Sequence, residues 1–273
     1  MNNNLLNTWY DGLRMDEHLI DLHVSKTSTS SVTPLGENAW RLEIPAGSNR
    51  RYRLAQLDDH GGRRRSKFLW QPPLIFTLQA RVSAENLPGT WGFGLWNDPF
   101  SFLLGYEGVV LHLPTLPDAA WFFYASPQNY LSFRNDLPAN GLLAATFSSL
   151  RIPPLLVDIA APALALSLIP GAAQWVRRLL RRAINQDSSQ IFTQLTEWHT
   201  YRMEWEKSHV RFYLDDRQIY ITDVVPHPPL SLVIWVDNQY MALPPTGRLK
   251  YGYLPNPKPA WLELKDLQLR EKP

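Results

Sequence analysis

The sequence contains no cysteine among its 273 residues. This absence excludes disulfide frameworks, thiolate zinc sites and cysteine nucleophiles. An excess of charge of either sign is also missing, because 27 Lys and Arg against 25 Asp and Glu leave a net charge of +2. Such a balance gives no reason to predict nucleic-acid binding. The first residues carry no basic stretch followed by an apolar stretch, so we expect no secretory signal and a cytoplasmic location.

An uninterrupted apolar run of membrane-spanning length is missing as well. The run at 152–176 is broken by Asp158 and by four prolines, whereas a transmembrane helix needs about 20 consecutive apolar residues. Residues 172–184, which overlap its end, follow a helical period with two faces. The apolar face carries Ala172, Val176, Leu179, Leu180 and Ala183, and the basic face carries Arg177, Arg178, Arg181 and Arg182.

This pattern predicts a helical insertion at about 150–190 in an otherwise β-rich chain. Three roles are open for it. The helix packs on the domain, for example as a lid, or it lies on a membrane surface with its arginines near anionic headgroups. In the third role its arginines bind a simple anionic partner. The second role makes the protein a peripheral membrane protein.

Proline and aromatic residues, in contrast, are abundant. The chain has 23 prolines, 11 tryptophans, 11 tyrosines and 11 phenylalanines. Apolar and polar residues alternate with a period of two in five segments, at 39–44, 74–82, 201–206, 209–214 and 261–270. This alternation is typical of half-buried antiparallel strands. We therefore predict an all-β chain, a single jelly-roll domain over 1–273 built from two antiparallel sheets packed as a sandwich.

The segments after residue 197 carry a distinctive hairpin. Trp198-His-Thr-Tyr-Arg-Met-Glu-Trp, followed by Val210-Arg-Phe-Tyr-Leu-Asp-Asp, resembles the hairpin of glycoside hydrolase family 16 and its concanavalin A-like relatives. The stretches that begin at Ser66, Phe76 and Pro88, and the last strand from Trp261, resemble further strands of that family in the same order. The resemblance covers about residues 40–270 without the insertion. It implies a concave sheet face that holds a ligand.

The catalytic residues of that family are missing from this sequence. The resembled hydrolases carry Glu-x-Asp-x-x-Glu or Glu-x-Asp-x-Glu on one strand, and a retaining mechanism needs two carboxylates about 5 to 5.5 Å apart. By chain order, the corresponding strand falls between residues 96 and 150. The acidic residues from 101 to 150 are Glu107, Asp118 and Asp136, which are too widely spaced to share one strand face. The expected strand instead contains Trp121-Phe-Phe-Tyr.

The implied concave sheet is formed from residues 91–96, 121–124, 142–147, 201–205 and 232–237. Aromatic rings on such a face can stack on sugar rings or line an apolar pocket. The predicted ligand-binding residues are Trp91, Trp96, Trp121, Phe123, Tyr124, Trp205, Trp235, Asn238 and Gln239. We predict no metal site and no cofactor, although the resembled family sometimes holds a structural calcium ion.

Three functions remain open at this point. We favour the binding of a carbohydrate or a hydrophobic small molecule in the aromatic cleft without hydrolysis. The second is an enzyme of different chemistry that acts on a hydrophobic small molecule in a lidded pocket. The third is a glycoside hydrolase with displaced carboxylates. Weak catalytic candidates are Tyr124, His199, Asp98 and Glu107, whose side chains can act as acid or base.

Overall fold

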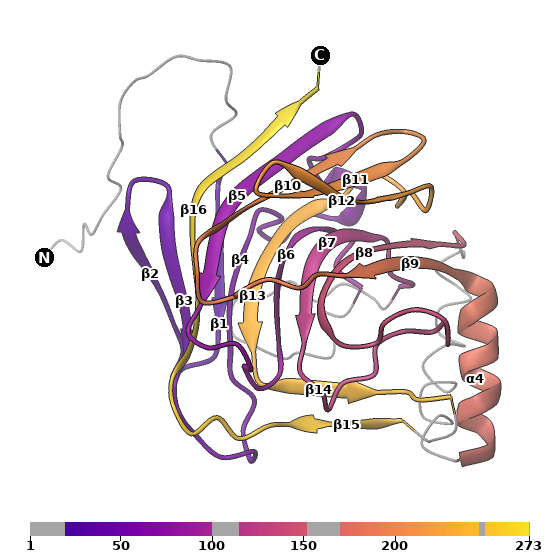
Figure 1. Cartoon of the computed structure of the whole chain (residues 1–273), viewed down its shortest axis with the longest axis horizontal. Coiled ribbons are helices and arrows are strands. Elements are labelled where there is room, and N and C mark those ends of the chain that lie inside the picture. Colours follow the sequence, from indigo (N-terminus) through magenta and orange to yellow (C-terminus); the bar gives the residue numbers. More distant parts are fainter. Residues whose placement is uncertain (1–19, 100–114, 152–169, 246–248, 273) are drawn as a thin grey trace, which may run out of the picture.

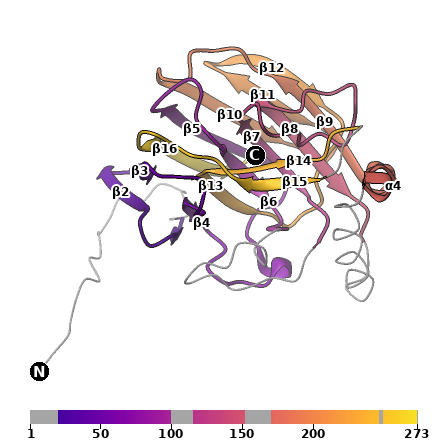
Figure 2. The same ribbon diagram turned by 90° about the horizontal axis from the view of Figure 1, so that it is seen from below.

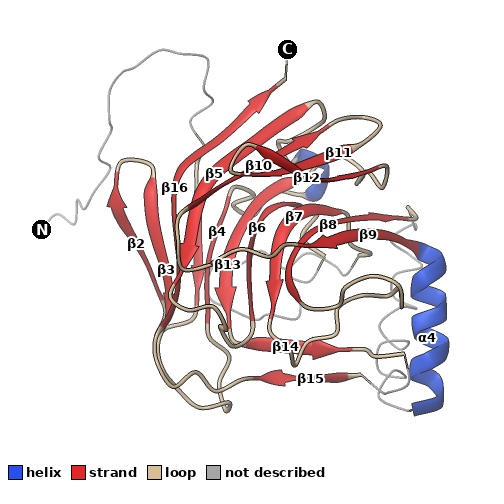
Figure 3. Cartoon of the chain, viewed as in Figure 1, coloured by secondary structure: helices blue, strands red, loops and turns tan. Residues whose placement is uncertain are grey.

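The computed structural model describes residues 20–99, 115–151, 170–245 and 249–272. Two seven-stranded sheets, here called sheet A and sheet B, pack face to face as a sandwich (Figures 1 and 3). A two-stranded ribbon and the helix α4 lie outside the sandwich, the helix beside the edge strand of sheet A (Figure 1). The predicted two-sheet jelly roll is therefore confirmed.

Neighbouring strands within each sheet are antiparallel. Sheet A contains, in spatial order, β1 (His23–Lys26), β4 (Leu54–Asp58), β13 (Ser231–Asp237), β6 (Thr90–Trp96), β7 (Ala119–Ala125), β8 (Gly141–Ser149) and β9 (Ile184–Gln190). Sheet B contains β12 (Arg217–Thr222), β11 (Val210–Leu214), β10 (His199–Trp205), β5 (Leu74–Val82), β16 (Ala260–Glu271), β3 (Ala39–Ile44) and β2 (Ser31–Gly36). The ribbon pairs β14 (Gln239–Ala242) with β15 (Lys250–Tyr253), α4 spans Pro170–Ala183, and a short 3-10 helix spans Arg65–Lys67.

The core between the sheets follows from the alternation in sequence. Strand β5 buries every second residue along its whole length, so one face meets sheet A and the other points outward. Large rings from both sheets interlock there. Phe122 of β7 meets Phe212 of β11 edge-on at 5.3 Å between ring centroids, and Phe93 of β6 meets Tyr201 of β10 edge-on at 4.9 Å. Edge-on contacts of this kind stabilise aromatic cores beyond the area they bury.

Two boundaries differ from the sequence predictions. Residues 184–190, expected inside the helical insertion, form the edge strand β9, because their buried residues alternate and pair with β8. Residues 201–205, expected on the concave sheet, lie in β10 of sheet B, where β5 and β11 flank them. The apolar residues 152–169 lie outside the described part of the chain.

The packing of the core predicts that the truncation of two different phenylalanines changes the free energy of unfolding by very different amounts. Phe122 is fully buried, whereas Phe192 is 85% exposed. We expect Phe122→Ala to lower the free energy of unfolding by about 3 to 5 kcal/mol and Phe192→Ala to change it by less than about 0.5 kcal/mol. Urea denaturation followed by far-UV circular dichroism measures both. Equal losses in the two variants would contradict this packing.

Candidate functional site

Sheet A has an outer face, defined by the side chains that point away from sheet B. Because strand residues alternate between faces, this face receives Trp96 from β6, Trp121 and Phe123 from β7, and Trp235 from β13. Together with their neighbours these side chains form a second buried cluster, separate from the core between the sheets. Its buried members are Leu54, Trp96, Ala119, Trp121, Leu143, Ala145, Phe147, Ile184, Val233 and Trp235. Phe123 and Phe133 are partly buried against it.

The centre of this face is a three-ring cluster made of Trp121, Phe123 and Trp235. Each ring contacts the other two, with centroids 5.3 to 5.5 Å apart. Gly92 and Gly94 of β6 provide the room beneath the rings. A Cβ atom at Gly92 would lie 2.7 Å from the Trp235 ring, and one at Gly94 would lie 2.6 Å from the Trp121 Cβ. The two glycines therefore let large rings lie close to the strand backbone.

The nine predicted ligand-binding residues fall into three groups. Trp96, Trp121, Phe123 and Trp235 lie together on the outer face. Three further residues lie in the core between the sheets, where they have no free surface for a ligand: Trp91, Tyr124 and Trp205. Trp91 and Tyr124 belong to sheet A but point to its inner face, and Trp205 belongs to sheet B. We therefore correct their assignment and leave them out of the candidate site.

Asn238 and Gln239 form the third group, at the end of β13. Asn238 is fully buried and holds loops together: its Oδ1 accepts from the Arg53 amide at 2.8 Å, and its Nδ2 donates to the Leu254 carbonyl at 2.9 Å. It is therefore a structural residue. The side-chain Oε1 of Gln239 is buried without a hydrogen-bond partner, so this atom has no accessible surface for a ligand.

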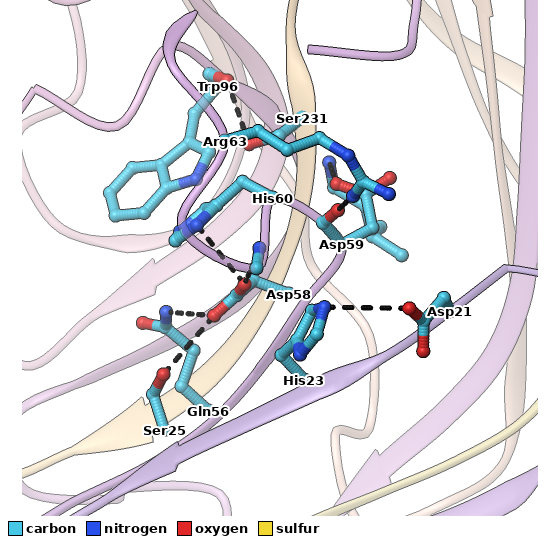
Figure 4. A network of polar contacts seen from close by, with 12 residues as sticks. Asp21, His23, Ser25, Gln56, Asp58, Asp59, His60, Arg63, Trp96 and Ser231 are labelled. Atoms are coloured by element: carbon cyan, nitrogen blue, oxygen red, sulfur yellow. Dashed lines mark hydrogen bonds and ion pairs between the residues drawn. The ribbon is translucent and has the colours of Figure 1, made fainter. Parts of the chain in front are cut away.

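A buried polar network borders the outer face at the end of β4 (Figure 4). Asp58 is its centre. Its Oδ2 accepts from Ser25 Oγ at 3.3 Å and from Gln56 Nε2 at 3.0 Å, while Nδ1 of His60 lies 3.3 Å from its Oδ1. Figure 4 also draws Trp96, whose carbonyl accepts a hydrogen bond from the Ser231 hydroxyl at 3.4 Å and whose ring belongs to the cluster on the outer face. Asp58 and its three partners are buried, so this end of the face is polar and dry.

The neighbouring Asp59 points to the opposite side of β4. It accepts hydrogen bonds from the Leu232 amide at 2.8 Å and from the indole N–H of Trp70. Burial raises the pKa of Asp59 to about 7, against the lowering effect of these two donors. Asp59 therefore fastens β4 to the core and does not reach the outer face.

A second buried carboxyl group, Asp237, borders the other end of the outer face. It accepts from the Thr90 amide at 3.1 Å, the Thr90 hydroxyl at 2.9 Å and the Tyr52 hydroxyl at 3.2 Å. The indole N–H of Trp235 donates to the same Thr90 hydroxyl at 3.0 Å, so Asp237 is connected to the three-ring cluster. Burial raises the pKa of Asp237 to about 7.

The two carboxylates on the outer face are too far apart for glycoside hydrolysis. Among the described strand residues of sheet A, Asp58 and Asp237 are the acidic residues whose parity places them on this face. Asp58 lies opposite Val233, four positions from Asp237 along β13. At a rise of about 3.3 Å per residue the separation is about 13 Å, beyond the roughly 5 to 9.5 Å that retaining and inverting hydrolases use.

The weak catalytic candidates do not form one site. Tyr124 is in the core between the sheets. His199 begins β10 in sheet B, where its Nδ1 lies 2.7 Å from Asp215 Oδ2 and its Nε2 lies 2.9 Å from Thr193 Oγ1. Asp98 is buried in the turn after β6, and its carbonyl accepts from Arg65 at 2.6 Å. Glu107 lies outside the described residues.

The arginines of α4 fall into two groups, one exposed and one buried. Arg178, Arg181 and Arg182 are exposed, as the sequence predicted for a basic face. Arg177 is buried and is thus removed from that face. Its guanidinium donates to the carbonyls of Ser132 at 2.6 Å and Leu243 at 2.7 Å, so its role is to hold the helix on the domain.

Sequence reasoning missed Asp58 and His60 at one end of the outer face, whereas Asn238 and Gln239, which follow Asp237 at the other end, were among the predicted ligand-binding residues. Asp58 is the last residue of β4, and Asp59 and His60 follow it directly, a position at which strand ends often carry functional groups. Only the fold shows that they are buried. Within the described ranges, no group of three or more His, Asp or Glu side chains is arranged to hold a metal ion.

No family model matches the sequence, and no curated protein matches it. Among solved structures, a glycoside hydrolase family 16 endo-glucanase from Bacteroides ovatus superposes with a TM-score of 0.50 and 10% identity, over 93% of this chain and 95% of that one. For a β-glucanase from Bacillus licheniformis the TM-score is 0.47, with 10% identity over 94% and 95% of the two chains. The match to a sialidase covers 92% of this chain and only 17% of that chain, with a TM-score of 0.44 and 7% identity.

The likeness to the endo-glucanase shows the fold. The chain is a two-sheet antiparallel jelly roll, the fold of that family 16 enzyme. This confirms the resemblance that the hairpin and the strand order indicated. The low identity carries no information about activity.

The two buried carboxyl groups predict a pH dependence of stability. Asp59 and Asp237 have folded-state pKa values of about 7, above the unfolded value of about 3.9. The folded state therefore holds more protons between these values, and the free energy of unfolding falls as the pH rises from about 4 to about 7. Each group contributes at most about 1.4 kcal/mol per pH unit.

The variant Asp237→Asn tests this decrease of the free energy of unfolding with rising pH. The matched control is Asp223→Asn, which changes an exposed aspartate. Urea denaturation between pH 5 and about 7.5 measures the free energy of unfolding. We expect a shallower decline in Asp237→Asn and an unchanged decline in the control. A wild-type protein that becomes more stable as the pH rises across this range would contradict the assignment.

Proposed function

We propose that this protein binds a carbohydrate on the outer face of sheet A and does not hydrolyse it. The observation that carries the proposal is the three-ring cluster of Trp121, Phe123 and Trp235, set on two glycines and bordered by polar groups at both ends. Ring faces bind the apolar C–H patches of sugars, and a few polar groups fix orientation. A protein of known structure with the same fold is an endo-glucanase, which supports this choice of ligand class.

The absence of hydrolysis follows from the carboxylates. Asp58 and Asp237 lie about 13 Å apart by strand rise, and the Asp58 oxygens already accept hydrogen bonds from Ser25 and Gln56. Asp58 and Asp237 therefore do not supply the pair of nucleophile and general acid that glycoside hydrolysis requires. We therefore expect binding without release of reducing ends.

An apolar small molecule is the second candidate ligand, and the burial of the site favours it. Trp121 and Trp235 are only 7% and 8% exposed. An open groove for a long polysaccharide leaves more of each ring free, whereas small-molecule sites bury most of their lining. The two candidates therefore differ in ligand size and polarity, and both use the same rings.

Phe123 is the side chain with which to test both candidates, because it belongs to the cluster but is only partly buried. Calorimetric titration with short β-glucan oligosaccharides measures sugar binding, and titration with anilinonaphthalene sulfonate measures apolar binding. Truncation of an aromatic ligand contact costs about 1 to 2 kcal/mol, so we expect Phe123→Ala to weaken the relevant ligand about tenfold. Phe192→Ala, which removes an exposed ring elsewhere, is the control.

The outcomes separate the candidates. If the wild type binds oligosaccharides and Phe123→Ala weakens this binding, the carbohydrate is supported. If the wild type binds only the dye and Phe123→Ala weakens that binding, the apolar ligand is supported. Release of reducing ends by the wild type, lost in Asp58→Asn or Asp237→Asn, would contradict the proposal of a non-hydrolytic site. Binding that both phenylalanine variants leave unchanged would place the site elsewhere.

A further inference from the structure

The helix α4 has a face that the domain does not cover. Leu180 and Ala183 pack against the cluster on the outer face of sheet A, and Val176 is buried. The exposed side chains of the last three turns are Gln174, Trp175, Arg178, Leu179, Arg181 and Arg182. Figures 1 and 2 both place α4 at the edge of the molecule, so this face is open to a large partner.

Arg177 fixes the direction in which that face points. Besides the carbonyls of Ser132 and Leu243, its guanidinium donates to Asn135 Oδ1 at 2.9 Å and lies 5.2 Å from the centre of the Tyr130 ring. A helix held by a buried charge with several partners cannot rotate without losing them. The exposed residues are therefore presented on a fixed surface.

Two large apolar side chains stand on this surface. Trp175 is 52% exposed and Leu179 is 46% exposed, and they lie one helical turn apart, so they are neighbours. Leu150, 62% exposed, is close to the end of the helix, since its amide donates to the Ala183 carbonyl at 2.8 Å. Grouped exposed apolar side chains usually mark an interaction surface.

The charged side chains that α4 itself places around these residues are all arginines. Arg178 and Arg182 are also one turn apart, Arg181 is exposed, and α4 contains no acidic residue. Asp136, which feels the charge of Arg181, is already paired with Arg134. Arginines in a last turn stabilise a helix through its dipole, which accounts for Arg181 and Arg182. It does not account for Arg178 or for the exposed tryptophan and leucine.

We infer that the exposed face of α4 binds the surface of an anionic lipid bilayer. Tryptophan and leucine enter the boundary between headgroups and acyl chains, while arginine side chains extend to lipid phosphates. Each basic residue near an anionic surface adds to binding, and salt screens the attraction. A nucleic acid or another soluble polyanion matches the arginines alone and leaves the apolar pair unexplained. Within the described part of the chain, no helix is long and apolar enough to cross a membrane, so α4 lies on the surface.

Vesicle flotation of the full chain tests this inference, and it is independent of the proposed ligand-binding function. The probes are vesicles of phosphatidylcholine alone and of phosphatidylcholine with about one-third phosphatidylglycerol. We expect the wild type to float with the anionic vesicles only, and to float less as salt is added. Arg178→Glu with Arg182→Glu should lower the partition coefficient at least tenfold. Trp175→Ser with Leu179→Ser should lower it as well, most clearly at high salt.

The matched control is Arg50→Glu with Arg51→Glu, which makes the same charge change at two other exposed arginines. Far-UV circular dichroism verifies that each variant is folded. Flotation of the control like the wild type supports the inference. An equal loss in the control, no flotation of the wild type, or retention on heparin without flotation would overturn it, the last in favour of a soluble polyanion as partner.

Discussion

The central strands of sheet A are apolar on both faces, and the rest of the structure depends on this constraint. Antiparallel sheets commonly pack one face on a core and leave the other to solvent. Here β13 is buried at every position and β6 at nearly every one. The inner face meets sheet B through Phe93 and Phe122, as expected for a sandwich. The outer face therefore needs an explanation of its own, and the aromatic cluster with its polar borders is the reason to regard it as a site.

The polar groups around that face are organised, and their positions limit the chemistry. The Asp58 network and the Asp237 network occupy opposite ends of the three-ring cluster, and their carboxyl groups accept hydrogen bonds from the protein itself. Buried carboxyl groups that are satisfied in this way orient neighbouring groups and exclude water. A glycosidase needs two free carboxyl groups on either side of one bond. Among the described residues, Asp58 and Asp237 on this face do not have the spacing that such a cleavage requires.

The fold could be predicted well from the sequence, because apolar and polar residues alternate with a period of two in strands that have one polar face. Apart from Ile75, apolar and polar residues alternate over 74–82, and this segment forms β5, in which every second residue is buried. The same rule failed for the site, because β6, β7 and β13 are apolar at both parities and no alternation indicates which rings face which sheet. Trp91 and Trp96 differ by five positions and therefore lie on opposite faces. The spacing does not tell which of the two rings faces sheet B. Only the pairing of β6 with β7 and β13 determines that.

Long-range contacts account for the remaining differences. The helical period of residues 172–184 placed Arg177 with three other arginines, but the carbonyls of Ser132 and Leu243 come from distant parts of the chain and bury it. Leu179 was expected on the packed face, and it is exposed because the domain covers a different part of the helix. Asp58 of β4 likewise has a partner on another strand, because Ser25 of β1 donates a hydrogen bond to it at 3.3 Å. A pattern along one element predicts its faces, and the packing of other elements decides which face is covered.

The central claim is that a ligand occupies the outer face of sheet A. The most direct measurement follows the indole N–H signals of the eleven tryptophans by heteronuclear NMR, during titration with the ligand that calorimetry identifies. The account predicts that the signals of Trp96, Trp121 and Trp235 shift, while those of Trp91 and Trp205, sealed between the sheets, stay in place. Shifts confined to tryptophans away from the outer face, or to Trp175 on α4, would contradict it.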